Sequence, residues 1–292
     1  MHRFVFLTID GLASGAVYAV FALSLVLVWR AARIINFAQA AVSIAAAYLA
    51  WSIAGPVSWW AALLVAPVAG ALIGVGVERT ALRRMGPERH LDAMIVALGA
   101  ALVIQGVLGM AYGTQSRGLP TPVSDRVLVV GGVPTTSPYR LLVLAAVALL
   151  VAALALLFTR TRLGLRLRAA AFAPEVARLS GVSVARTTTV AWALSTGLGA
   201  LAAMLVLPTG IGLHPTAMDG VFLTAFTAAV LGGLDSALGA VVGGFAVGLV
   251  LNYATGYAAA PNVAPVAVLG LLLAVLVVRP GGLLGARAAR RV

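Results

Sequence analysis

The chain has 292 residues, of which 62% are hydrophobic and 10% charged, and its net charge is +12. Soluble domains are about 45–50% apolar and about 25% charged, so this composition excludes a water-soluble globular protein. The chain has no cysteine, which also excludes disulfides, thiolate catalysis and thiolate metal sites.

Long, continuous apolar runs predict an all-α, polytopic membrane helix bundle of about 8–9 spans. No loop is long enough to fold separately, so we expect one transmembrane domain over residues 1–292, with its largest loops at 113–140 and 159–187. A short hairpin around Gly131 and Gly132 is expected in the first of these loops. In chain order, the expected spans are 4–28, 34–53, 59–77, 93–112, 141–158, 188–207, 221–231, 237–253 and 263–278.

The run from 221 to 253 is expected to be broken in the middle. As one helix it would be about 50 Å long at 1.5 Å per residue, whereas the hydrocarbon core is about 30 Å thick. Gly232, Gly233, Asp235 and Ser236 favour a turn or hinge there, because glycine permits unusual backbone angles and serine favours turns.

The arginines predict the orientation of these spans. All 20 basic residues are arginine, and 16 of them fall on one side of the nine-span topology and 4 on the other, which together make 20. The positive-inside rule therefore places the N-terminus outside and the C-terminus in the cytoplasm. An unbroken 221–253 helix would move the C-terminal arginines to the outer side, so charge and length both support the break.

Neutral polar residues on the spans allow two interpretations. Residues 36, 39 and 43 have the spacing of one helix face; such residues either form interhelical hydrogen bonds or line a substrate pathway. The candidate pathway residues are Asn36, Gln39, Ser43, Gln105, Thr224 and Thr227.

Small residues are concentrated in the last third of the chain. Gly239 and Gly243 have G-x-x-x-G spacing, and Gly244 and Gly248 repeat it. Close helix packing explains this spacing, and a hinge or gate is the alternative.

The expected inner loop, 159–187, contains a helix signal. Pro174 suits a first helical turn, Glu175 complements the positive end of the helix dipole, and Gly181 suits a C-cap. The loop also holds six arginines, so it either contacts anionic lipid or projects a short helix toward a soluble partner.

The chain offers no catalytic chemistry of its own. A phosphate-binding P-loop requires a lysine, which the sequence lacks, and its three histidines are scattered without metal-ligand spacing. The acids, apart from Asp10, lie at or beyond the ends of the expected spans. Since ion-coupled carriers usually keep an ionisable group within the bilayer, we expect energy to be supplied by a partner.

Four stretches carry a resemblance to a known family. Together they resemble the permease subunits of bacterial ATP-binding-cassette (ABC) importers for branched-chain amino acids, the leucine/isoleucine/valine family. The stretches are INFAQA at 35–40, TRLG at 161–164, EVARLSGV at 175–182 and AAVLGGLDS at 228–236.

The resemblance implies a mechanism and partners. The third stretch is similar to the E-A-A-x-x-x-G coupling-helix signature, which implies ATPase coupling through Glu175, Ala177, Arg178 and Gly181, although Val176 replaces the usual alanine. It further implies an inner-membrane complex with two cytoplasmic ATPases that bind ATP and Mg, an extracytoplasmic solute-binding protein, and a second permease or a copy of this chain. No cofactor is expected in the chain itself.

The first stretch departs from the family pattern. Gln39 and Ala40 stand where the commoner form has His-Gly, so urea, short amides or another small solute are alternative substrates. A stand-alone channel or secondary carrier is the alternative from another class.

Overall fold

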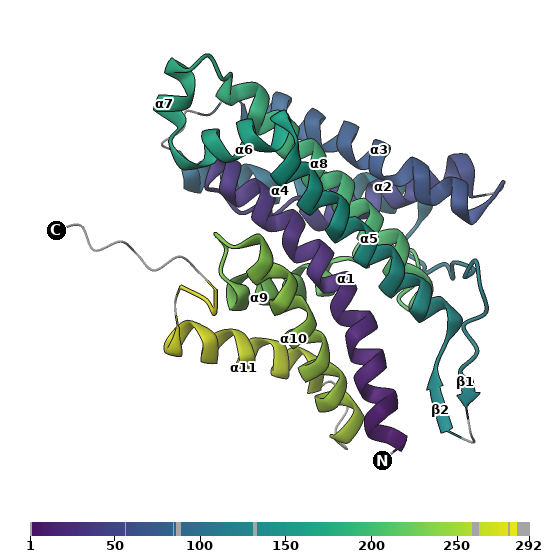
Figure 1. Cartoon of the computed structure of the whole chain (residues 1–292). Helices are drawn as coiled ribbons and strands as arrows, with labels where there is room; N and C mark the ends of the chain where they lie inside the picture. The colour runs from purple at the N-terminus through teal and green to yellow at the C-terminus, as the bar shows by residue number, and fades with distance from the viewer. Residues whose placement is uncertain are drawn as a thin grey trace. The chain divides into compact units, whose positions relative to one another are not determined.

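The computed structural model describes residues 2–55, 57–83, 85, 89–130, 133–258, 263–279 and 281–284 (Figure 1). The chain divides into two compact units. Unit 1 comprises Met1–Val26, Val123–Val147 and Val221–Val292, and unit 2 comprises Leu27–Pro122 and Ala148–Gly220. The elements are α1 (His2–Ala32), α2 (Gln39–Ala54), α3 (Trp59–Val77), the π-helical turn η1 (Glu78–Leu82), α4 (His90–Tyr112), β1 (Leu128–Val130), β2 (Val133–Thr136), α5 (Pro138–Arg160), α6 (Arg162–Phe172), α7 (Pro174–Leu179), α8 (Val184–Val206), the 3₁₀ turn η2 (Leu207–Thr209), α9 (Asp219–Gly232), α10 (Ala237–Tyr257) and α11 (Val263–Val278).

All nine expected spans are present as apolar helices in the described ranges, which confirms the all-α membrane bundle. Among the residues that the structure describes, six helices are long and apolar enough to cross a membrane, and three shorter apolar helices accompany them. The shorter helices are α2, α9 and the 266–278 part of α11. Most boundaries lie within a few residues of the predicted ones, because long apolar runs fix the middle of a helix better than its ends.

The expected start of the second span is wrong by five residues. α2 begins at Gln39 rather than at Ile34. Arg33 has a positive φ of 55°, which stops α1, and the side-chain oxygen of Asn36 accepts a hydrogen bond from the Ala38 N–H at 3.0 Å. Such an Asx turn competes with helix, so Asn36 precedes the helix on which we expected it.

The break between 221 and 253 is confirmed. α9 ends at Gly232, and Gly233 adopts a φ of 99°. The hydroxyl of Ser236 accepts from the Gly239 N–H at 2.9 Å and caps α10. A glycine with positive φ commonly ends a helix, and a serine N-cap commonly starts one. Gly233 and Ser236 therefore mark the end of α9 and the start of α10.

The hairpin expected in the loop 113–140 is also present. β1 and β2 pair antiparallel, with Val130 opposite Val133, and the glycines expected at the turn lie outside the described residues. The nearby Arg140 on α5 forms an ion pair with Asp10 on α1, so the one acid expected inside a span has a cationic partner within unit 1.

In unit 1, α10 contacts two other helices through glycine. On one face, a Cβ atom on Gly243 would overlap the backbone of Ala228 on α9. On another face, a Cβ atom on Gly248 would overlap the backbone of Gly11 and Gly15 on α1. The G-x-x-x-G spacing therefore serves close packing, as in other membrane helix pairs.

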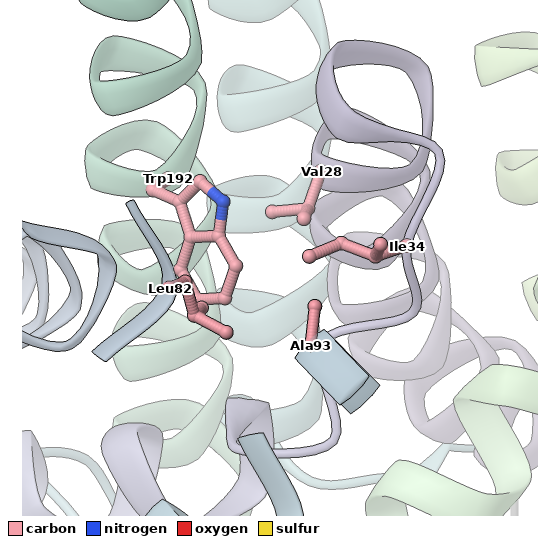
Figure 2. Close-up of a cluster of buried hydrophobic side chains, with 5 residues drawn as sticks. All are labelled: Val28, Ile34, Leu82, Ala93 and Trp192. Atoms are coloured by element: carbon pink, nitrogen blue, oxygen red, sulfur yellow. The ribbon is translucent and has the colours of Figure 1, made fainter. Parts of the chain in front are cut away.

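Unit 2 is built around α2, α3 and α8, which pack extensively against one another. Five buried residues form a hydrophobic cluster at one end of these helices (Figure 2). The cluster joins the end of α1, the loop before α2, η1, the start of α4 and the first half of α8. Its members are Val28, Ile34, Leu82, Ala93 and Trp192.

Candidate coupling surface and polar interior

The segment 159–187 forms two helices of unit 2, where one was expected. α6 follows α5 directly, because the hydroxyl of Thr161 caps it by accepting from the Gly164 N–H at 3.1 Å. The sequence analysis missed α6, although the threonine N-cap and the alternating arginines and leucines after it are a readable amphipathic signal.

Gly164 brings α6 close to α5. A Cβ atom at this position would overlap the backbone of Leu157 and Phe158, so only glycine permits the approach. The TRLG stretch thus has a structural basis, in which Thr161 starts the helix and Gly164 packs it against the preceding one.

The predicted helix at the centre of the loop is confirmed as α7. Pro174 is its first residue, and Gly181 ends it with a φ of 79°. The Val182 N–H donates to the Ala177 carbonyl at 2.9 Å, a helix-ending bond typical of a glycine C-cap. Nothing lies within 4 Å of the space that a Gly181 Cβ would fill, so backbone conformation alone requires this glycine.

The four predicted coupling residues lie together on this turn, with different surroundings. Glu175 and Arg178 form an exposed ion pair at 3.1 Å, which contributes little to stability. Ala177 is 4% exposed and faces the inner side of the turn, where α7 packs against α6.

Large apolar side chains are exposed on the same two helices, which lie outside the apolar spans. Phe172 is 93% exposed, Val176 61% and Leu179 90%. Contiguous exposed apolar residues outside a membrane mark interaction sites. We call these three residues the α6–α7 apolar surface.

Three of the predicted pathway residues form a buried hydrogen-bonded cluster in unit 2. Asn36 Nδ2 donates to Gln39 Oε1 at 2.8 Å, Ser43 Oγ donates to the Gln39 carbonyl at 2.7 Å, and Gln39 Nε2 donates to the Ser195 carbonyl on α8 at 3.0 Å. Asn36, Gln39, Ser43 and Ser195 are all fully buried. This geometry supports the interhelical hydrogen-bonding interpretation, and a role in a substrate pathway stays a prediction.

Gln105 has different surroundings. On the partly exposed side of α4, its Nε2 donates to Asp219 Oδ1 at 2.9 Å. Asp219 is exposed, in unit 2, at the first turn of α9. Sequence analysis did not assign Asp219, because it lies just before the expected span and no spacing links it to Gln105.

The remaining predicted residues belong to unit 1. Thr224 and Thr227 are buried on α9, and the Thr227 hydroxyl donates to the Leu223 carbonyl at 2.9 Å. The structure therefore does not bring all six predicted pathway residues together within one unit.

A buried acid in unit 2 was also not assigned. Glu78, 4% exposed, lies where α3 passes into η1, and its Oε2 accepts from the Thr189 hydroxyl of α8 at 3.0 Å. Among the residues that the structure describes, no group of three or more His, Cys, Asp or Glu side chains could hold a metal ion.

Comparison with known proteins identifies similar chains. The model of a family described as branched-chain amino acid transport system / permease component matches residues 7–277. The high-affinity branched-chain amino acid transport system permease protein BraD of Pseudomonas aeruginosa is 28% identical over 300 residues, which cover 95% of this chain and 94% of BraD. LivH of Escherichia coli, a protein of the same description, is 28% identical over 94% of both chains. A probable LivH of Methanocaldococcus jannaschii is 28% identical over 90% of this chain and 87% of its own.

Proposed function

We propose that this chain, which belongs to the family of branched-chain amino acid transport system permease components, translocates branched-chain or related amino acids as the membrane permease subunit of an ABC importer. The observation that carries the proposal is the family match over residues 7–277, which includes all nine apolar helices almost completely. Fold alone does not imply function. The family match is a match of sequence, and it also includes the loop helices α6 and α7.

We assign ATPase coupling to α7 and its flanks. The α6–α7 apolar surface lies outside the spans, and the ion pair of Glu175 and Arg178 lies beside it. A partner that covers Phe172 and Leu179 removes apolar area from water, which favours docking by about 25 cal/mol per Å². ATP and Mg are then bound by partner ATPases and not by this chain, which has no lysine for a P-loop.

A second permease subunit, related or identical, is part of the proposal. The hydrogen-bonded pair of Gln105 and Asp219 is accessible beside exposed apolar residues of α4 such as Leu98 and Leu102. A carboxylate that faces hydrocarbon is costly, so we infer that this surface of unit 2 faces the other permease or the aqueous pathway. Two ATPase subunits and an extracytoplasmic binding protein complete the proposed assembly.

We further propose an inner-membrane location with the N-terminus outside and the C-terminus in the cytoplasm, as a single transmembrane permease domain. The 16 to 4 distribution of the 20 arginines supports this orientation. It places 159–187 on the side where the ATPases are.

Transport by the reconstituted complex tests the proposal. Proteoliposomes that contain this chain with its ATPases and second permease, supplied with binding protein and internal ATP, should accumulate labelled leucine. An ATPase variant without the phosphate-binding lysine should accumulate none. Leucine flux in liposomes that contain this chain alone would instead support the channel or carrier alternative. Accumulation of urea or acetamide, without accumulation of leucine, would identify urea or a short amide as the substrate in place of branched-chain amino acids.

A further inference from the structure

We propose that unit 2 binds an anionic phospholipid in a crevice between α1, α5, α6 and α8. The crevice is partly open to the surroundings, and its cavity volume is about 20 Å³. Its lining includes two cations, Arg30 and Arg168, together with the apolar side chains Leu27, Phe158, Leu167 and Leu194.

The two arginines lie at the level of the lipid headgroups. Arg30 is two residues before the end of α1, and Arg168 is on α6, the amphipathic helix that follows the end of α5. The ends of membrane spans meet the headgroup region, and basic pockets between helices on the positive side bind anionic headgroups. An arginine guanidinium forms paired hydrogen bonds with phosphate.

The apolar part of the crevice lies at the level of the acyl chains. Leu194 on α8 is six residues beyond residue 188, where the expected span begins, or about 9 Å along the helix at 1.5 Å per residue. Leu27 is likewise deeper in α1 than Arg30. The crevice therefore has cations near the span ends and apolar side chains further in. This order matches a phospholipid, whose charged headgroup lies at the membrane surface and whose acyl chains lie below it.

The surroundings favour a negative headgroup over a zwitterionic one. By sequence, the segment 159–187 has six arginines and a single acid, and that acid, Glu175, is paired with Arg178 on α7. Each basic residue near a membrane surface attracts anionic lipid with about 1 kcal/mol. Free phosphate would use the arginines but leave the apolar lining uncovered, so we commit to a phospholipid.

The α6 helix is positioned to form this crevice. Gly164 lets α6 approach the backbone of Leu157 and Phe158, which places Leu167 and Arg168 beside Phe158. The lipid would then contact the same helix that leads into α7. This site is independent of the proposed substrate and of the proposed ATPase contacts.

Lipid binding to the purified full chain tests the proposal. After delipidation, native mass spectrometry should show dioleoylphosphatidylglycerol bound at least about tenfold more tightly than dioleoylphosphatidylcholine, given two arginines. The pair Arg30→Gln and Arg168→Gln should remove this preference. The matched pair Arg162→Gln and Arg166→Gln, on the same helix but outside the crevice lining, should change it less than about twofold.

A second variant tests the apolar part without changing charge. Ala171→Phe should fill the crevice and weaken phosphatidylglycerol binding, whereas Ala169→Phe, which is outside the lining, should not. If thermal melting shows that Arg30→Gln does not fold, the charge test uses Arg168→Gln alone, because the Arg168 side chain is exposed.

Three outcomes overturn the proposal. Equal binding of the two lipids contradicts a site for anionic lipid. An equal loss of phosphatidylglycerol binding in both arginine pairs shows that the preference comes from the general positive charge of α6 and not from the crevice. Displacement of phosphatidylglycerol by millimolar inorganic phosphate identifies an ion site without a lipid.

Discussion

The two units hold their helices together by different means. In unit 1, α10 meets α1 through Gly244 and Gly248, where backbone touches backbone. In unit 2, α2 meets α8 through the buried side chains of Gln39 and Ser195, and Gly199 on α8 leaves room for the side chains of Gln39 and Ser43. We call these contacts the glycine seam and the amide seam.

The two seams show two ways in which helices associate inside a membrane. Lipid is as apolar as leucine, so helices in a membrane associate through close packing or hydrogen bonds and not through the hydrophobic effect. The glycine seam depends on shape alone and tolerates no added atom. The amide seam depends on satisfied polar groups, and its side chains can move when a neighbour grows.

The largest effect is expected in the glycine seam. Gly248→Ala places a Cβ against the backbone of Gly11 and Gly15, and we expect it to destabilise unit 1 by about 2–3 kcal/mol. Gly270→Ala on α11, where nothing lies within 4 Å, should instead be neutral or slightly stabilising because alanine favours helix. Thermal unfolding in detergent measures both, and equal shifts in the two variants would contradict the seam.

A smaller effect is expected when Gln39 is replaced. Gln39→Leu removes the bond to the Ser195 carbonyl and leaves the Asn36 amide without its acceptor, at a cost of about 1–2 kcal/mol. Ser195→Ala removes the hydroxyl that donates to Gln39 Oε1 at 3.2 Å, so unfolding measurements on Gln39→Leu, Ser195→Ala and the double variant should give a non-additive sum. Unchanged stability with lost transport would favour the substrate-pathway interpretation.

Gly199→Ala should cost about 1 kcal/mol, less than Gly248→Ala. Its Cβ would meet the Gln39 and Ser43 side chains and not the backbone, so these side chains can shift. The cost should nearly vanish in a background that carries both Gln39→Ala and Ser43→Ala, because both side chains that the Cβ would meet are then shortened. An undiminished cost in that background, measured by the same unfolding assay, would show that the backbone of α2 limits the space.

The smallest effect on stability is expected at α7, which lies outside both seams. Glu175→Arg replaces one member of an exposed ion pair, so the melting temperature should stay within about 1 °C, while ATPase association and transport fall about tenfold or more if α7 couples the subunits. Gly181→Pro should also lower ATPase association and transport, because proline cannot adopt the φ of 79° found there and the end of α7 must change its conformation. Glu175→Gln is the matched control and should retain most activity. Normal complex formation and transport in both test variants would remove the coupling assignment.

The sequence was sufficient for the type, the approximate positions and the break of the apolar helices, because span length and glycine chemistry are local properties. It also located α7, since Pro174 and Gly181 carry local signals. It placed Asn36 on a helix that starts at Gln39, because spacing does not reveal an Asx turn. It could not pair Gln105 with Asp219 or Glu78 with Thr189, since long-range contacts have no periodic pattern.

The two glycine faces of α10 have a consequence for motion. Gly243 faces α9 and Gly248 faces α1, and each contact is limited by backbone atoms that have no alternative rotamers. Gly248 is flanked by Val247 and Leu249, so a slide of α10 along α1 would bring side-chain atoms toward the space now left by a glycine, and small displacements meet a steep barrier. Within unit 1, these three helices should therefore travel as one rigid block when the transporter cycles, and bending must occur in the connections beyond them.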